Sequence, residues 1–411
     1  MSERTISMAP ACKMTIGASA EIGIKSIEQL EWKATVNGGY VLKARMYDPY
    51  FTILKKAGVI GSFLQSARKE PTPVTFQLFW AGNPKSVAKR RVAFITDLDV
   101  FGPPAEGMFE FVAIDPPTWF LNAGDSSGKV YTGNVSDVIT QVVKEYTGGQ
   151  IKLEITKTDD NDKGKWGMMR QDPRTFIQSL LEWSSSLSRQ KKTNWMTFSV
   201  DRKLVIKQQH DLKPELLACY TTSFGKGKND VKDWNMLSST YITALQNQVV
   251  TQGISTVSGK FIDKKTDPKN TVVKDLNTSE KVNVGIDQKR GFAKSDSEYS
   301  TSIVAIPEFS AGEIGMKYDE WIDGRARNMY LNMLPMVMAM RISVLGDHRF
   351  DDPTKLGVGY INLEWKDLDD ENFFLSGKWL VNGFNHRMET DSWYTDLYLY
   401  RYDYNAKAQI V

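Results

Sequence analysis

The sequence predicts an α+β fold in which antiparallel β-strands dominate both ends of the chain and an α/β unit is inserted between them. Residues 74–80, 91–100 and 109–114 have strand-like composition and are separated by Asn, Gly and Pro. Residues 136–187 hold two runs of apolar residues at helical spacing. Residues 393–401 alternate with a period of two, which is typical of a strand.

The first helical pattern runs from Ser136 to Tyr146 and ends at Gly148. Its apolar residues form one buried stripe, and Ser136 is a suitable N-cap. A strand is expected at 151–155, and a hairpin at 195–207 turns at Asp201. These elements predict a compact α/β unit at about 110–208.

The second helical pattern follows Arg170 and begins at Asp172 and Pro173. Asp172 is a good N-cap, and Pro173 fits the first helical position, where its missing N–H has no cost. Phe176 opens an apolar face that continues along the helix. The structural role expected for Arg170, Asp172, Pro173 and Phe176 is to fix the start and the packing of this helix.

The remaining chain divides by composition. Residues 251–317 are polar and difficult to interpret, and residues 318–332 predict a helix that ends before Pro335. Strands are expected at 340–345, 359–365, 376–387 and 393–401. We therefore expect a discontinuous first β-domain from 1–108 and about 209–250, the α/β insert at 109–208, and a second β-domain at 318–411, to which 251–317 could also contribute.

The terminal strand places Tyr394, Tyr398 and Tyr400 on one face and Thr395, Leu397 and Leu399 on the other. One interpretation is that one face is buried and the other contacts a second molecule. The alternative, a strand whose tyrosines pack beneath a loop, remains open.

The composition argues against several classes of protein. The 411 residues carry a net charge of +3, which is weak for a nucleic-acid or anionic-membrane binder. Two distant cysteines, Cys12 and Cys219, predict free thiols, not a disulfide framework. No secretory signal or membrane-spanning stretch is visible, so we expect a soluble chain made in a cytoplasm, without stable membrane association.

No motif supports catalysis, a cofactor or a metal. Gly124 to Gly128 matches G-x-S-x-G around Ser126, but no helix is expected after it and none of the three histidines stands out as a base. Gly253 to Phe261 has the wrong spacing for a phosphate loop. We expect a non-enzymatic protein with no cofactor.

Four segments together resemble one family. Residues 109–121, 170–183, 376–387 and 393–399 resemble, in order and spacing, the central hub proteins of contractile phage baseplates. The hub portion of type VI secretion spike proteins and the phage late-control D proteins are similar. The match covers about 110–208 and 318–401, whereas 251–312 departs from the family pattern.

The resemblance implies a homotrimer in which each subunit carries two tail-tube-like antiparallel β-barrels. Six barrels would then surround a channel, joining a sixfold tail tube to a threefold central spike. Implied partners are the tube, the spike and other baseplate proteins, with the tape measure protein as a further candidate and DNA as passing cargo. The implied location is the virion tail after assembly in the host cytoplasm.

The candidate interface residues are Tyr394, Tyr398 and Tyr400, together with Trp379 and His386, which the family motif contributes. His386 has a competing interpretation as a strand residue with a satisfied hydrogen bond. Three other functions remain open: a tail-associated peptidoglycan hydrolase on a hub-like scaffold, a carbohydrate-binding module, and a DNA-binding protein.

Overall fold

The computed structural model describes residues 9–17, 21–58, 71–81, 89–124, 128–158, 163–168, 171–187, 195–208, 212–223, 229–237, 262–266, 271–275, 282–283, 300–301, 338–366 and 375–401. The helix expected at 318–332, and most of the polar segment before it, lie outside these residues. Within that segment the structure describes four short strands, β15 (Ile262–Thr266), β16 (Thr271–Asp275), β17 (Val282–Asn283) and β18 (Ser300–Thr301).

Most of the described strands form one sheet of 13 strands. Its N-terminal members are β1 (Pro10–Ile16), β2 (Ile22–Gly23), β3 (Ile27–Thr35), β4 (Gly39–Tyr47), β5 (Pro73–Trp80), β6 (Arg91–Phe101) and β7 (Met108–Ile114). Its C-terminal members are β13 (Glu215–Ser223), β14 (Val231–Met236), β19 (Met338–Leu345), β20 (Gly359–Lys366), β21 (Gly377–Glu389) and β22 (Trp393–Arg401). Every pairing in this sheet is antiparallel except that of β13 with β20, so the predicted antiparallel β-fold is confirmed.

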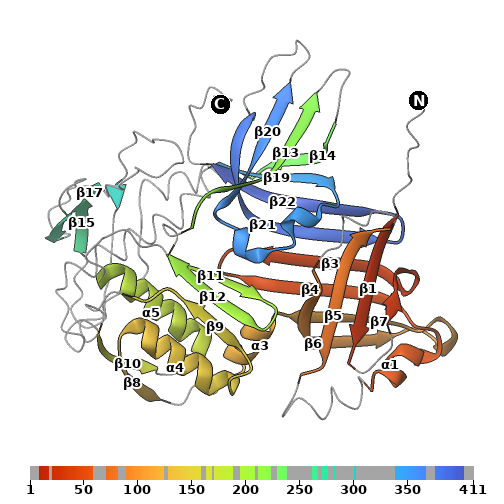
Figure 1. Cartoon of the computed structure of the whole chain (residues 1–411), viewed down its shortest axis with the longest axis horizontal. Coiled ribbons are helices and arrows are strands. Elements are labelled where there is room, and N and C mark those ends of the chain that lie inside the picture. The colour runs from red at the N-terminus through yellow and green to blue at the C-terminus, as the bar shows by residue number, and fades with distance from the viewer. Residues whose placement is uncertain are drawn as a thin grey trace.

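The two ends of the chain meet through β3 and β21. These strands pair from Gln29↔Glu389 to Thr35↔Gly383. The result is an eight-stranded layer in the order β6-β7-β4-β3-β21-β22-β19-β14, whose strands lie roughly horizontal in Figure 1. One hydrophobic core contains residues of both halves. The expected barrels are therefore joined in one sheet over a shared core, and their closure remains a prediction.

The other strands of the sheet cover the core side of this layer. β1 and β5 cross over β3, β4 and β7 of the N-terminal half (Figure 1). β20 pairs with β21 on one side and with β13 on the other. β13 and β14 are also linked by the bridge Thr222↔Asn229.

The pairing of β13 and β14 differs from the grouping that the sequence suggested. Residues 209–250 were expected to join the first β-domain, but β13 pairs with β20 and β14 pairs with β19, both C-terminal strands. Strand patterns show which residues face a core, but not which distant strand completes the ladder. The described part of 209–250 therefore belongs with the C-terminal half.

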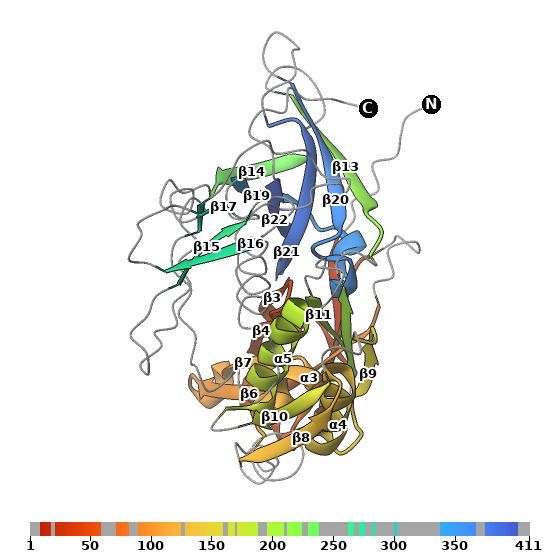
Figure 2. The same ribbon diagram turned by 90° about the vertical axis from the view of Figure 1, so that its left-hand side faces the viewer.

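The inserted unit has a hydrophobic core of its own, made from residues 121–206. Its elements are α3 (Pro116–Asn122), β8 (Lys129–Gly133), α4 (Val135–Thr147), β9 (Lys152–Ile155), β10 (Gly164–Met168), α5 (Pro173–Leu187), β11 (Trp195–Val200) and β12 (Lys203–Gln208). β11 and β12 form the predicted hairpin, and β12 also pairs with β9 in parallel. Figure 2 shows this insert at the end of the molecule opposite β13 and β20.

Two helix starts differ from expectation. α4 begins at Val135 after Asn134, so Ser136 is not its N-cap; the Ser136 N–H donates to Thr158 Oγ1 at 3.1 Å. α3 was not expected, because residues 109–114 read as a strand and the two prolines after it are typical of an irregular segment. Asp115 caps α3 by accepting from the Thr118 N–H at 2.8 Å, and Pro116 stands at the first helical position.

Short helical segments complete the described chain. They are η1 (Ile24–Ser26), η2 (Pro49–Phe51), α1 (Thr52–Lys56), η3 (Pro104–Glu106), η8 (His348–Phe350) and η9 (Pro353–Lys355). The segments η8 and η9 lie in the loop between β19 and β20, which carries the polar residues described below.

Candidate assembly surface and buried polar network

The eight-stranded layer has one core face and one charged face, because side chains alternate along each strand. One cross-strand row crosses all eight strands and is buried throughout: Ile95, Ala113, Leu42, Trp32, His386, Thr395, Val344 and Val231. The next row points the other way: Asp97, Val112, Lys43, Glu31, Arg387, Tyr394 and Leu345. The layer thus turns a charged face away from the core across both halves of the chain.

Three pairs of opposite charges bridge neighbouring strands on this face. Glu110 accepts from the Arg45 guanidinium at 3.0 Å. Asp233 accepts from Arg341 at 2.7 Å, and Asp396 accepts from a terminal nitrogen of Arg387 at 3.0 Å. Such cross-strand pairs favour the ladder modestly. Because the face also carries exposed charged side chains such as Lys43 and Asp97, it is suited to contact with water.

Three of the five predicted interface residues are buried within their own chain. Trp379 and His386 are fully buried, and Tyr400 is 3% exposed. The Trp379 Nε1–H donates to the Leu375 carbonyl at 2.8 Å. Since these side chains present no surface to a second molecule, an interface role for them is wrong. The family motif that contributed Trp379 and His386 does not say which face of the strand meets the core. Tyr400 has the same parity along β22 as Tyr394 and Tyr398, but it is covered by its own chain.

Tyr394 and Tyr398 are half-buried and lie on the charged face. Tyr398 packs beneath Lys33, whose Nζ is 5.4 Å from the ring centre. Burial, followed by the nearby Asp396 charge, raises the pKa of Tyr398. The strand is therefore as predicted, and these two tyrosines remain candidates for contact with another molecule.

The helix-start motif lies where the sequence placed it. Asp172 caps α5 by accepting from the Thr175 N–H at 2.9 Å and from the Thr175 hydroxyl at 2.6 Å. α5 begins at Pro173, and Phe176 is buried in the core of the insert. The Phe176 ring lies 5.8 Å from that of Tyr131. Arg170 lies outside the described residues.

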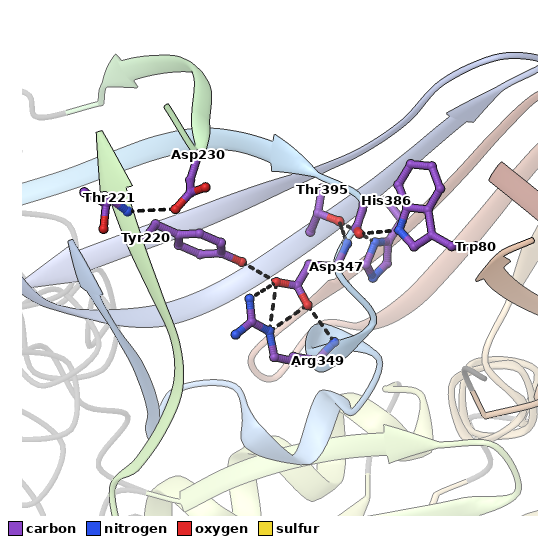
Figure 3. Close-up of polar contacts among 9 residues, drawn as sticks. Trp80, Tyr220, Thr221, Asp230, Asp347, Arg349, His386 and Thr395 are labelled. Atoms are coloured by element: carbon purple, nitrogen blue, oxygen red, sulfur yellow. Dashed lines mark hydrogen bonds and ion pairs between the residues drawn. The ribbon is translucent and has the colours of Figure 1, made fainter. Parts of the chain in front are cut away.

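A buried polar network crosses the C-terminal half on the core side (Figure 3). The Tyr220 hydroxyl donates to Asp347 Oδ2 at 2.6 Å, and the Arg349 guanidinium donates to both carboxylate oxygens. Burial alone would raise the pKa of Asp347, but the bonds from Arg349 and Tyr220 hold it below its ordinary value. The Asp347 N–H donates to Thr395 Oγ1 at 2.9 Å, which links this carboxylate to β22.

The network continues through His386. Its Nδ1 lies 2.9 Å from Thr395 Oγ1 and accepts from the Trp393 Nε1–H at 3.3 Å. Because an indole N–H can only donate, Nδ1 is the unprotonated nitrogen and the proton is on Nε2. His386 stacks on Trp32 at 5.2 Å between ring centres. This supports the interpretation of His386 as a strand residue with a satisfied hydrogen bond.

Arg91 joins the sheet to the insert and to the β19–β20 loop. Its side chain is 3% exposed and donates to Asp201 Oδ2 at 3.2 Å. Its second terminal nitrogen donates to the Asp351 carbonyl. Asp201 Oδ1 also accepts from the Val92 N–H at 3.0 Å. Sequence reasoning missed this joint, although period-two alternation places Arg91 on the same face as Ala93 and Ile95.

Two arrangements that resemble catalytic motifs do not have the geometry of an active site. Thr395, His386 and Asp351 follow one another as in a nucleophile–base–acid arrangement, but they are 0%, 0% and 6% exposed. The segment around Ser126 lies between α3 and β8, the reverse of the strand-to-helix order that a nucleophile elbow needs. Within the described ranges, no cluster of His, Cys, Asp or Glu is arranged to hold a metal ion. No described helix is long and apolar enough to cross a membrane.

Comparison with known proteins identifies the fold. No protein-family model and no curated protein sequence matches this chain. Among solved structures, a prophage MuSo2 43 kDa tail protein from Shewanella oneidensis aligns over 96% of this chain and 98% of its own, with TM-score 0.57 and 11% identity. A tail protein from Neisseria meningitidis MC58 aligns over 96% of both chains, with TM-score 0.55 and 9% identity. The chain has the fold of phage tail proteins.

The similarity extends to a secretion spike assembly. A chain of the Francisella PdpA–VgrG complex aligns over 96% of this chain with TM-score 0.51 and 11% identity. This chain spans 58% of that one. The resemblance to phage tail and spike-related proteins is thus confirmed at the level of the fold.

Proposed function

We propose that this chain is a structural, non-enzymatic hub of a phage tail baseplate. In this proposal, three copies form a ring that joins the sixfold tail tube to a threefold central spike and encloses the channel through which DNA passes. The ring resides in the virion tail after assembly in the host cytoplasm, and other baseplate proteins and the tape measure protein are further candidate partners.

The observation that carries the proposal is the eight-stranded layer built equally from both halves. β6, β7, β4 and β3 come from one half, and β21, β22, β19 and β14 from the other. A chain with two similar four-stranded halves, repeated by a threefold axis, presents six comparable units. Six comparable halves in three copies would allow a trimer to match a neighbour with sixfold symmetry.

The two faces of the layer support a channel. A face lined with charged side chains suits a water-filled passage, whereas the opposite face is buried against the chain's own core. Each half would close into a tail-tube-like barrel on the core side. In the C-terminal half the Asp230 N–H donates to the Thr221 carbonyl at 3.0 Å, beside the Thr222↔Asn229 bridge, which favours closure between β13 and β14.

The outer edges of the layer support ring formation. β6 pairs with β5 only from Arg91 to Phe94, and from Asp97 to Phe101 no described strand pairs with its second edge. Open strand edges are hazards unless another chain or element covers them. Pairing of edges between subunits would remove that hazard and continue the layer around a channel.

The mass of the full chain in solution tests this proposal. Light scattering across a concentration series should give three times the chain mass of 46.5 kDa. A stable monomer that also fails to assemble with the tube and spike proteins of the same tail would contradict it. Cell-wall lysis or glycan binding by that monomer would instead support the hydrolase or the carbohydrate-binding interpretation.

A further inference from the structure

One end of the eight-stranded layer exposes large apolar side chains. Across β6, β7 and β4, the last row at this end is Phe101↔Met108↔Tyr47, and in the other half Leu345 pairs with Tyr394. Tyr47, Phe101 and Leu345 are 44%, 40% and 52% exposed. The ladders through β3 and β21 place both groups at the same end of the layer. Together with Val100 and Tyr50 they are called here the apolar end.

The end of β6 projects beyond the protein's own core. Val100 and Phe101 are consecutive and therefore point to opposite faces of the strand. Both are about equally exposed, at 42% and 40%. A strand end that is apolar and exposed on both faces is not covered by its own chain, which is typical of a surface that meets a partner.

Tyr50 is held outward by a strained loop. Tyr50 and Phe51 both adopt left-handed backbone conformations, with φ of 58° and 54°. The buried Asp48 carboxylate fixes the loop by accepting from the Thr52 hydroxyl and from the N–H groups of Ile53 and Leu54, at 2.9–3.0 Å. The Tyr50 side chain is 61% exposed. The left-handed backbone at Tyr50 and Phe51 costs free energy, and it holds the Tyr50 ring in an exposed position. Such a strained and exposed residue favours a binding role for Tyr50.

The opposite end of the layer is different, because the insert covers it in the N-terminal half. There the turn between β3 and β4 holds Asn37, whose carbonyl accepts from Arg174 at 3.1 Å. Asn37 Oδ1 also accepts from the Thr197 N–H at 2.7 Å. Only one insert exists per chain, so this end repeats three times in a trimer, whereas the apolar end repeats in both halves.

We propose that the apolar end is the face on which the tail tube ring docks end-on, an inference that rests on the trimeric hub proposed above. Both halves contribute apolar side chains there, so three copies present six sites to a sixfold neighbour. Exposed side chains of both signs border the N-terminal site: Asp97, Asp99 and Glu106 on one side, and Lys55 and Lys56 of α1, which follow Tyr50. The matching face of the tube protein therefore presents apolar side chains bordered by both acidic and basic residues.

The test uses the full chain and the tail tube protein made by the same phage or prophage. The variant Tyr50→Asn with Phe101→Thr removes two exposed aromatic rings while keeping residues suited to a left-handed φ and to a strand. Val130→Thr is the matched control, because Val130 is an apolar residue 62% exposed on β8 of the insert. Binding to assembled tube is measured by co-sedimentation, and trimer mass by light scattering.

We expect the double variant to remain trimeric and to lose at least tenfold in tube affinity, while the Val130 variant binds as wild type does. Tube binding that survives in the double variant, or that is lost in the Val130 variant, overturns this docking face but leaves the trimeric hub intact. Loss of the trimer in the double variant alone would assign the apolar end to contact between copies of this chain. A monomeric wild type that does not bind tube would overturn the hub proposal itself.

Discussion

His386 Nε2 lies 3.6 Å from Asp351 Oδ1, and neither buried atom has a hydrogen-bond partner among the described residues. Burial, opposed in part by Arg91, raises the pKa of Asp351 to about 8. Burial lowers the pKa of His386 to about 3. At neutral pH the pair is therefore a largely protonated carboxyl beside a neutral imidazole.

The Asp351 carboxyl predicts a loss of stability on the alkaline side. Its folded pKa exceeds the unfolded value of about 4, so its contribution is present below pH ~4 and is lost as pH rises toward 8. His386 acts oppositely between pH ~3 and ~6.5, because only the unfolded state then binds its proton. The two slopes offset each other from pH ~4 to ~6.5, and stability should fall from pH ~6.5 to ~8.

The variant Asp351→Asn should remove that alkaline loss, because an amide cannot ionise. We expect the difference in unfolding free energy between the variant and wild type to shift by about 1–2 kcal/mol in favour of the variant as pH rises from 6.5 to 8. Urea denaturation at each pH measures it. Asp352→Asn is the control, since burial raises the pKa of Asp352 but hydrogen bonds from Thr354 lower it overall. If the unfolding free energy of Asp351→Asn falls with pH as steeply as that of wild type, the Asp351 carboxyl is not protonated in the folded protein.

The Arg91 joint predicts that one buried guanidinium contributes strongly to the attachment of the insert. Arg91→Met leaves Asp201 without its guanidinium partner and should lower the free energy of unfolding by about 2–4 kcal/mol. It should also speed proteolysis of the insert relative to the sheet. Arg90→Met is the matched control, because Arg90 donates to Thr75 at an exposed site. If the two variants have the same unfolding free energy and the same rate of proteolysis, Arg91 does not hold the insert to the sheet.

The burial of Trp379 predicts a role in stability and not in assembly. Trp379→Ala should cost about 3–5 kcal/mol of unfolding free energy, as expected for a large side chain removed from a core. Tyr394→Ser, on the half-buried charged face, should cost far less. If Trp379→Ala unfolds at the wild-type denaturant concentration but no longer assembles, this side chain acts at an interface and not in the core.

The cap of α5 predicts a smaller and local effect. Asp172→Ala removes two hydrogen bonds to Thr175 and should destabilise the protein by about 1 kcal/mol. Asp137→Ala is the control, since Asp137 is exposed in the first turn of α4 and is not its N-cap residue. Thermal unfolding should give a lower midpoint temperature for Asp172→Ala than for Asp137→Ala. Equal midpoint temperatures would argue against a stabilising cap at Asp172.

Elements whose sequence signal lies within a few neighbouring residues were predicted well. The cap at Asp172, the stripe of α4 and the hairpin around Asp201 all depend on residues within a few positions of one another. α3 was missed although Asp115 before Pro116 carries the same signal as Asp172 before Pro173. The preceding strand pattern obscured it.

Non-local relations could not be predicted from the sequence. β13 pairs with β20 across more than a hundred residues, and no local pattern selects that partner. Nor does a family motif say which face of β21 meets the core, so the motif residues Trp379 and His386 were assigned to an interface although both are buried. The joint at Arg91 needs three distant segments and becomes visible only in the folded chain.

Electron microscopy of the purified full chain would show whether three copies form a ring around a channel. We expect ring-shaped particles with threefold symmetry, an open central channel, and a lumen wall formed by the charged face of the eight-stranded layer. Particles without a channel, or rings whose lumen is lined by another surface, would contradict it.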